Sequence, residues 1–191
     1  MDAWPHFSKK PKKSNQTIII IANQIHTETN DTGWICIYRS RGWESSSNDV
    51  RVDVAWKKVG DGHALRLWRV STEIEAPPGE LLNRVLRERH LWDTSMVKWR
   101  CVARLDKKSD VFHYTTTSEV PPVSRDVTLL RSWRTDLPRG ACLVAEMSID
   151  HSDTPITSGT VRSIVLASRY LIQPCGAGKC RLVHLSRVDI M

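Results

Sequence analysis

The sequence predicts an α+β fold in which a curved antiparallel sheet packs against helical structure. Three observations predict this fold. Apolar side chains recur at helical spacing within residues 76–93, most segments on either side alternate with a period of two, and short turns separate those segments. Antiparallel strands joined by short turns form a twisted sheet, and one face of that sheet needs other elements to cover it.

Two strands are expected before the helix. Residues 52–59 and 65–76 have the composition of strands, and residues 60–63, Gly-Asp-Gly-His, join them. Glycine supplies the positive φ angles that tight hairpin turns require. The two strands are therefore expected to pair as an antiparallel hairpin.

One amphipathic helix follows. Pro77 and Pro78 end the preceding strand and favour a helix start, because proline fixes φ and lacks a backbone donor that the first turn does not use. Glu80 then lies near the positive end of the helix dipole. The apolar residues at helical spacing are Leu81, Leu82, Val85 and Leu86. We expect this stripe to be buried against the sheet.

Six more strands are expected after the helix, at residues 97–105, 111–120, 125–133, 141–150, 163–173 and 180–190. In the first of them, Val97 and Trp99 alternate with Lys98 and Arg100, which predicts one apolar and one charged side. Turn compositions at residues 106–110, 136–140 and 176–179 separate several of these strands. No internal repeat interrupts the series, so a single meandering sheet is expected.

The length favours one domain and a tail. Of the 191 residues, 40% are hydrophobic and 26% are charged, as in ordinary globular domains. Residues 1–49 show no periodic pattern that would close a core, so we expect them to be a flexible, unassigned segment. Residues 50–191 are expected to form the domain. The longest aliphatic run, residues 18–22, is far shorter than the roughly 20 apolar residues of a membrane span.

Charge and cysteine usage restrict the partners and the compartment. The net charge of +7 and the isoelectric point near 9.4 favour anionic lipid head groups, nucleic acid or an acidic protein surface. No nucleic-acid-binding motif accompanies the charge, so no nucleic acid is expected. Five cysteines without a CxxC pair or a secretory leader favour reduced thiols in the cytoplasm.

No group of residues predicts an enzyme. Residues 150–153, Asp-His-Ser-Asp, contain the residue types of a hydrolytic triad, but neighbours on one loop cannot align a nucleophile with its base. Residues 175–180, Cys-Gly-Ala-Gly-Lys-Cys, lack the spacing of a phosphate-binding loop or a zinc site, which favours a glycine hairpin. We expect no catalytic residues, no metal and no cofactor.

Arg131 interrupts an apolar pattern. On the strand at residues 125–133 it shares a side with Val127, Leu129 and Trp133, which are expected to face inward. An unpaired buried charge costs several kcal/mol. Arg131 is therefore paired, extended to a rim, or placed to hold a polar group of a ligand.

Three segments resemble the START (StAR-related lipid transfer) domain, and within that family the domain that ends the deleted-in-liver-cancer Rho GTPase-activating proteins. They read DGHALRLWRVSTEIEAPPGELLNRVLRERHLWD, SRDVTLLRSWRTDLPRG and SRYLIQPCGAGKCRLVHLSRVDI. The resemblance implies a helix-grip fold, in which a curved antiparallel sheet and helices enclose a cavity for one lipid. START domains finish with a long lid helix, whereas the last expected strand here ends one residue before Met191. Residues 50–191 are therefore expected to be a C-terminally truncated START domain without the lid helix.

The resemblance also implies a ligand site. Arg131 matches a basic residue that lines the cavity in sterol-binding relatives and pairs there with an acid on the preceding strand. Here the nearest match to that acid is Thr115, which is uncharged, and Glu119 lies near the end of its strand. The residues expected to line the lipid cavity are Val127, Leu129, Arg131, Trp133, Val165 and Leu182.

Two functions remain open at this point. The first is a lipid-binding START module of a Rho GTPase signalling regulator, which holds a lipid of unspecified identity without catalysis. The alternative is a docking module that targets such a regulator to a protein partner or an anionic membrane, with no lipid transfer. The basic rim proposed for docking comprises Arg84, Arg87, Arg89, Arg139, Lys179 and Arg181. Either function fits a cytoplasmic protein that associates peripherally with membranes.

Overall fold

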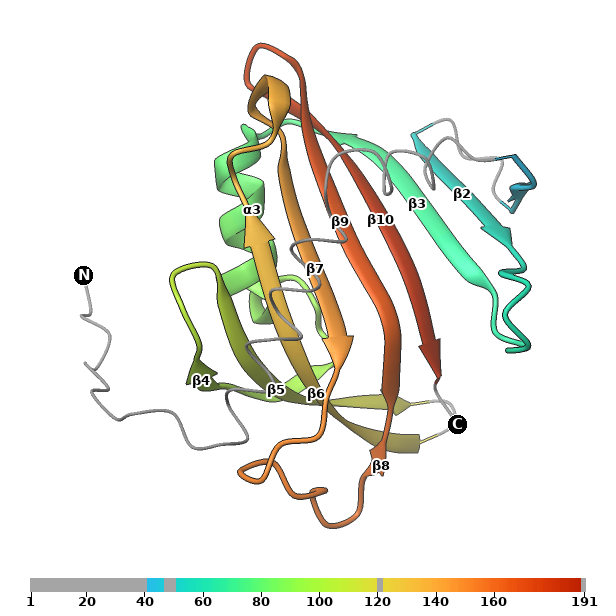
Figure 1. Ribbon diagram of the computed structural model, residues 1–191, viewed down its shortest axis with the longest axis vertical. Helices are drawn as coiled ribbons and strands as arrows, with labels where there is room; N and C mark the ends of the chain where they lie inside the picture. Colours follow the sequence, from blue (N-terminus) through green and yellow to red (C-terminus); the bar gives the residue numbers. More distant parts are fainter. Residues whose placement is uncertain (1–40, 47–50, 120–121, 190–191) are drawn as a thin grey trace.

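A computed structural model describes residues 41–46, 51–119 and 122–189, and these residues form one sheet with a helix on one face (Figure 1). The first elements are β1 (Glu44–Ser45), β2 (Val52–Lys57), β3 (Leu67–Ile74), helix α3 (Pro78–Arg87) and the 3₁₀ helix η1 (Arg89–Leu91). The remaining elements are β4 (Met96–Arg104), β5 (Ser109–Glu119), β6 (Pro122–Arg134), η2 (Pro138–Gly140), β7 (Cys142–Ser148), β8 (Val161–Arg162), β9 (Ile164–Gly176) and β10 (Lys179–Asp189). The predicted α+β fold is confirmed.

The sheet has the order β1-β2-β3-β10-β9-β7-β6-β5-β4, with β8 paired to β6 in parallel. Apart from β8, neighbouring strands are antiparallel. β3 lies beside β10, so an early strand and the last strand of the chain pair within the sheet. β4 forms one edge of the sheet. This pairing requires the chain to cross the sheet between β3 and β4, and α3 and η1 are the segment that makes the crossing.

The helix is shorter than the sequence pattern predicts. α3 ends at Arg87, because Glu88 has φ −116° and ψ 19°, and the chain continues as η1 rather than to residue 93. Leu81, Leu82, Val85 and Leu86 are buried, as their spacing predicts. Their contacts are with the sheet at β7, β9 and β10, so the crossing is fixed by apolar packing.

The sheet has two faces, which we name by their coverage. The helix face carries Leu129, Val144 and Ile172 and lies against α3. The outer face carries Leu130 and Ala145, which pack with each other. Figure 1 shows the strands bending as one curved surface, with α3 behind β6 and β7. β-bulges in the β4–β5 and β9–β10 pairs add to the bend.

Several boundaries differ from the sequence expectations. Asp110 belongs to β5 rather than to the turn at residues 106–110, because the backbone of Leu105 already pairs with Ser109. Val97 and Trp99 on β4 are exposed, so the buried side predicted for this segment is wrong at its start. β1 falls within the unassigned segment 1–49; residues 1–40 and 47–49 lie outside the described residues.

No helix follows β10 among the described residues, which end at Asp189. In the described part of the chain, no helix has the length and hydropathy needed to cross a membrane.

Candidate functional site

The six predicted cavity residues lie on the helix face. Val127, Leu129 and Val165 belong to one buried apolar cluster with Met96, Phe112 and Tyr114. Trp133 and Leu182 pack at the margin of a second cluster, which contains the apolar side of α3 together with Cys142, Val144, Tyr170, Ile172 and Cys180. Arg131 follows Leu129 and precedes Trp133 on the same side of β6, so it lies between the two clusters. The structure brings the six residues to one surface; their contact with a lipid stays a prediction.

Arg131 is fully engaged inside the protein. Its Nε and Nη2 each donate to Asp110, over 2.9 Å to Oδ1 and Oδ2, and its Nη1 donates to the carbonyl of Leu86 over 3.0 Å. The guanidinium carbon also lies 3.8 Å from the centroid of the Phe112 ring. Only 4% of Arg131 and 3% of Asp110 are exposed. The sequence allowed Arg131 to be ion-paired, to extend to a rim or to hold a ligand group, and the structure shows it ion-paired.

The partner differs from the sequence expectation. Asp110 stands opposite Arg131 in the β5–β6 register, whereas Thr115 stands opposite Asp126. The assignment of Thr115 as the nearest match is therefore wrong, because the preceding strand begins earlier than predicted. An acid does face Arg131 from the preceding strand. The backbone of Glu119 is paired with Pro122, farther along the same hairpin, and its side chain lies outside the described part of the structure.

A row of polar side chains crosses the helix face beside this ion pair. Glu146 on β7 stands opposite Arg131 in the register, and Ser168 on β9 stands opposite Glu146. Ser168 Oγ donates to Glu146 Oε2 over 2.9 Å and lies 3.2 Å from His184 Nε2. We call Asp110, Arg131, Glu146, Ser168 and His184 the polar row. It separates the two apolar clusters of the helix face.

Burial controls ionisation in the polar row. Desolvation, together with the positive charge of Arg89, lowers the pKa of His184 from 6.5 to about 4, so this imidazole is neutral at neutral pH. The His184 ring stacks on Tyr170, with ring centroids 4.0 Å apart. Burial also raises the pKa of the Tyr170 phenol, and the Glu146 carboxylate adds to that shift. Tyr170 therefore stays a hydrogen-bonding phenol rather than an anion.

Arg89 places a second guanidinium near the row. Its Nε donates to Asp93 Oδ2 over 2.9 Å, and its guanidinium carbon lies 4.9 Å from the centroid of the Tyr114 ring. Each of the two arginines near the row is thus paired with its own aspartate, and the charge of Arg89 still acts on His184 and Glu146. Sequence reasoning missed Glu146, Ser168 and His184, and it assigned Arg89 to the basic rim rather than to a position beside this row. For Glu146 a signal existed, since it continues the inward-facing positions Cys142 and Val144 with a charge.

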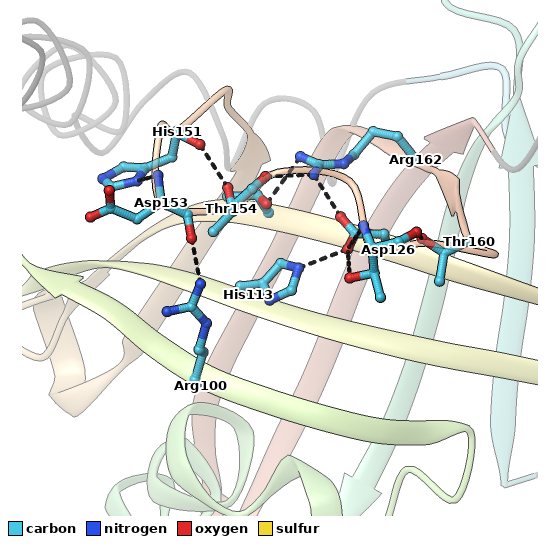
Figure 2. A network of polar contacts seen from close by, with 10 residues as sticks. Arg100, His113, Asp126, His151, Asp153, Thr154, Thr160 and Arg162 are labelled. Carbon is cyan, nitrogen blue, oxygen red and sulfur yellow. Dashed lines mark hydrogen bonds and ion pairs between the residues drawn. The ribbon is translucent and has the colours of Figure 1, made fainter.

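A second polar network holds the loop between β7 and β8 against the sheet (Figure 2). At its centre, the buried Asp126 accepts from His113 Nε2 and from Thr157 Oγ1, each over 2.8 Å, and pairs with Arg162 Nη2 at 2.7 Å. Desolvation alone would raise the pKa of Asp126, but these contacts outweigh it and lower the pKa. The loop is therefore tied to strands β5 and β6.

Other contacts fasten the same loop. Arg162 also donates to the Thr154 carbonyl over 2.8 Å, and Arg100 on β4 donates to the Asp153 carbonyl. Figure 2 shows these donors converging on the loop from different strands. Side chains of this cluster are occupied by one another, which fits a role in shaping the domain rather than in chemistry.

The other sequence motifs have structural roles. His151 and Ser152 make short local contacts with Asp153, as in a turn. Residues 175–180 form the predicted hairpin, in which Gly178 has φ +68° between β9 and β10. Within the described ranges, no cluster of His, Cys, Asp or Glu is arranged to hold a metal ion.

Two pockets are found away from the polar row. One, of about 220 Å³, lies beside η2 and the β9–β10 turn and includes Arg139 and Arg181. The other, of about 400 Å³, lies in the loop before β8 and includes Ile156 and Arg162. On the helix face itself, Ile74, Trp133, Leu182 and Val188 are only partly buried, so apolar surface there remains accessible.

Comparison with known proteins identifies the family. Residues 38–191 match the START domain. The mouse StAR-related lipid transfer protein 13 is 50% identical over 150 residues, which is 78% of this chain, and the human StAR-related lipid transfer protein 8 is 43% identical over 80% of it. Mouse Rho GTPase-activating protein 7 is 43% identical over 78% of the chain. The chain spans only 13–15% of the length of these relatives.

Solved structures agree. The human StarD13 (DLC2) lipid transfer and protein localization domain superposes with a TM-score of 0.74 at 43% identity, over 90% of this chain and 82% of that one. Human STARD10 superposes with a TM-score of 0.73 at 26% identity, over 84% of this chain and 67% of that one. The fold, the matched residues and these identities establish that this chain belongs to the START domain family, as a relative of the deleted-in-liver-cancer proteins.

Proposed function

We propose that this chain holds one lipid molecule against its helix face, without catalysis, as the lipid-binding module of a Rho GTPase regulator. The observation that carries the proposal is the arrangement of the helix face: two apolar clusters with the polar row between them. An amphiphile needs such a surface, since burying its hydrocarbon contributes roughly 25 cal/mol per Å² and one or two polar contacts set its orientation.

The charge balance of the polar row favours a lipid whose buried polar group is an uncharged hydroxyl. Arg131 is paired with Asp110 and Arg89 with Asp93, so each guanidinium already holds a carboxylate. The Glu146 carboxylate forms no ion pair with any described residue and accepts from the Ser168 hydroxyl, while its backbone carbonyl accepts from Arg169. A buried phosphodiester beside this carboxylate would be repelled, whereas a ligand hydroxyl can donate to it. Sterols and diacylglycerols are lipids of this class.

Accessible apolar residues indicate where the hydrocarbon lies. Trp133 and Leu182 are half-buried at the margin of the α3 cluster, and beyond the polar row Val188 is partly buried against the cluster that contains Val127 and Val165. A lipid spanning these positions would place its polar group at the row. Replacing Leu182 with Asp puts a charge on that path, and Lys58→Asp, at an exposed position after β2, is the matched control.

The test is lipid extraction followed by mass spectrometry. The purified chain is incubated with vesicles that contain cholesterol, diacylglycerol and phosphatidylcholine, separated from them and extracted. We expect a neutral hydroxyl lipid to be retained by the chain and by Lys58→Asp, but not by Leu182→Asp. Folded protein that retains no lipid under these conditions would contradict the proposal, and preferential retention of phosphatidylcholine would contradict the proposed lipid class.

The link to Rho signalling rests on the relatives alone. Rho GTPase-activating protein 7 is named for an activity, and this chain matches only 14% of its length. GTPase activation requires an arginine supplied to the nucleotide. Residues 38–191 match the START domain, so we place the GTPase-activating activity in the part of the relative that this chain does not match. We propose that residues 38–191 supply lipid binding to such a protein.

A further inference from the structure

One short segment carries a concentrated exposed apolar surface. Leu91, Trp92, Val97 and Trp99 are exposed by 62%, 49%, 50% and 44%, and they make up half of the eight large exposed hydrophobic residues in the described part of the chain. They lie on η1, the following turn and the start of β4. We call these four residues the apolar edge. Exposed apolar patches of this kind commonly mark interaction sites.

The structure holds the two indole rings of the apolar edge outward. Trp99 stacks on His90, with centroids 4.3 Å apart and planes 13° apart. Trp92 Nε1 donates to the carbonyl of Arg84 over 3.1 Å, so its polar atom is already satisfied. These two contacts fix the orientation of both indole rings, so the rings are exposed although their segment is held in place.

Positive charge surrounds the apolar edge. Residues 84–100 contain five arginines or lysines and two acids, Glu88 and Asp93, which gives a net charge of +3. Both acids are paired internally, with Arg84 at 3.1 Å and with Arg89 at 2.9 Å. Arg87 and Lys98 are exposed and form no ion pair with any described residue. Their charges remain available to an acidic partner.

Two other members of the expected basic rim are paired with acids, whereas Arg139 is exposed and forms no ion pair with any described residue. At the opposite end of the sheet, Lys179 pairs with Glu75 at 2.9 Å and Arg181 pairs with Glu73 at 2.7 Å. Acidic neighbours thus offset the charge there. Around the apolar edge, two exposed indoles lie within the same stretch of chain as two exposed cations that form no ion pair with any described residue.

We propose that the apolar edge is a docking surface for an anionic membrane, with Trp92 and Trp99 at the lipid–water interface and Arg87 and Lys98 on acidic head groups. Indole rings favour that interface, and each basic residue near an acidic leaflet contributes about 1 kcal/mol. A bilayer fits better than a protein strand, because β4 carries two bulges and the outward cations Lys98 and Arg100 along this edge. Trp99 stands opposite Tyr114 in the β4–β5 register, so the apolar edge borders the helix face at the β4 edge of the sheet. Docking there does not require the helix face to hold a lipid.

The experiment is co-sedimentation of the chain with vesicles of phosphatidylcholine alone and of phosphatidylcholine with phosphatidylserine, at low and high salt. We expect binding to the acidic vesicles that weakens with salt. The double charge reversal Arg87→Glu with Lys98→Glu should reduce that binding roughly tenfold or more. Leu91→Ser with Val97→Ser should also reduce it. Ile156→Ser with Ile164→Ser, which alters exposed apolar residues elsewhere, is the matched control and should bind like the unaltered chain.

Three results would overturn the proposal: equal binding to both vesicle types at all salt concentrations, unchanged binding by the edge variants, or a dimer that the edge variants dissociate. The last result would assign the edge to a second copy of the chain. Circular dichroism checks that each variant is folded. Lipid retention, measured by mass spectrometry, should survive the edge variants, so failure of docking and failure of lipid holding are distinguishable.

Discussion

The pairing of Arg131 with Asp110 explains how an arginine is tolerated among Val127, Leu129 and Trp133. Each guanidinium nitrogen has a partner, two on Asp110 and one on the carbonyl of Leu86 in the last turn of α3. Buried ion pairs of this kind add little net stability compared with apolar packing, but removing one member leaves an unpaired charge. The sequence indicates that Arg131 is unusual, but it does not reveal the partner, because the pattern places Asp110 in a turn whereas β5 begins two residues earlier than expected, at Ser109.

Replacing Arg131 with Met should lower the free energy of unfolding by about 3–5 kcal/mol, because Asp110 is left buried without a cation. Asp110→Leu added to Arg131→Met should restore much of that loss. Urea denaturation of the single and double variants measures both effects. An unchanged urea midpoint in Arg131→Met would show that the pair is solvated, and Glu75→Gln, in an exposed ion pair, serves as the control without an expected change.

His184 gives the protein a specific pH dependence. Its pKa is about 4 when folded and 6.5 when free, so the unfolded chain binds a proton first as the pH falls. Stability contributed by neutral His184 is complete above pH 6.5 and declines as the pH falls toward 4. Between pH 7.5 and 5 the loss from this group is about 2 kcal/mol, on the basis of 1.36 kcal/mol per pKa unit.

The matched variant is His184→Gln, whose amide NH2 can donate to Ser168 Oγ as the Nε2–H of neutral His184 does, but whose side chain cannot be protonated. Denaturation at pH 7.5 and 5 should show a smaller loss of stability in this variant than in the unaltered chain. Identical losses in the two proteins would place the origin of the acid sensitivity elsewhere, for example at Asp126.

At the scale of elements, local patterns predict strands well where both neighbours in the sheet are present. Residues 125–133 were expected as a strand and are found within β6, and the turn at residues 176–179 closes the expected hairpin. The helix pattern extends beyond α3 because Leu91 and Trp92 continue the apolar spacing, although η1 turns them outward. The β3–β10 pairing joins segments more than 100 residues apart and leaves no periodic signal in the sequence.

The pattern also fails at the β4 edge. Val97 and Trp99 alternate with charges as a half-buried strand would, yet an edge strand with bulges leaves both of its sides exposed. Alternation indicates which residues share a side, whereas burial depends on which element covers that side. Polar residues of the site, such as Glu146 and Ser168, were missed for the same reason: their proximity arises only from the register of β7 and β9.

The loop between β7 and β8 should depend on Asp126. Asp126→Asn removes the charge that pairs with Arg162 and weakens acceptance from His113 and Thr157, at a cost of roughly 1–3 kcal/mol. Hydrogen–deuterium exchange should show lost protection in residues 149–163 before any change in β9 and β10. Asp153→Asn, an exposed change in the same loop, should leave protection intact; uniform loss across the sheet would contradict a local anchoring role.

For the whole molecule, the structure presents two adjoining surfaces with different physical characters. The helix face is apolar, with internally neutralised charges, and suits a molecule removed from water. The apolar edge on η1 and β4 combines exposed indoles with nearby cations that form no ion pair with described residues, and it suits docking on a membrane surface. A module that docks with one surface and holds a lipid with the other would combine the two functions that the sequence left open.

Photo-crosslinking with a bifunctional hydroxyl lipid tests the central claim most directly. The chain is loaded with the lipid, separated from vesicles and irradiated, and the modified peptides are mapped by mass spectrometry. We predict modification on the helix face, in the segment around Trp133 and at Leu182, with loss of both signals in Leu182→Asp. Crosslinks confined to the outer face or to the apolar edge would contradict a lipid held between α3 and the sheet.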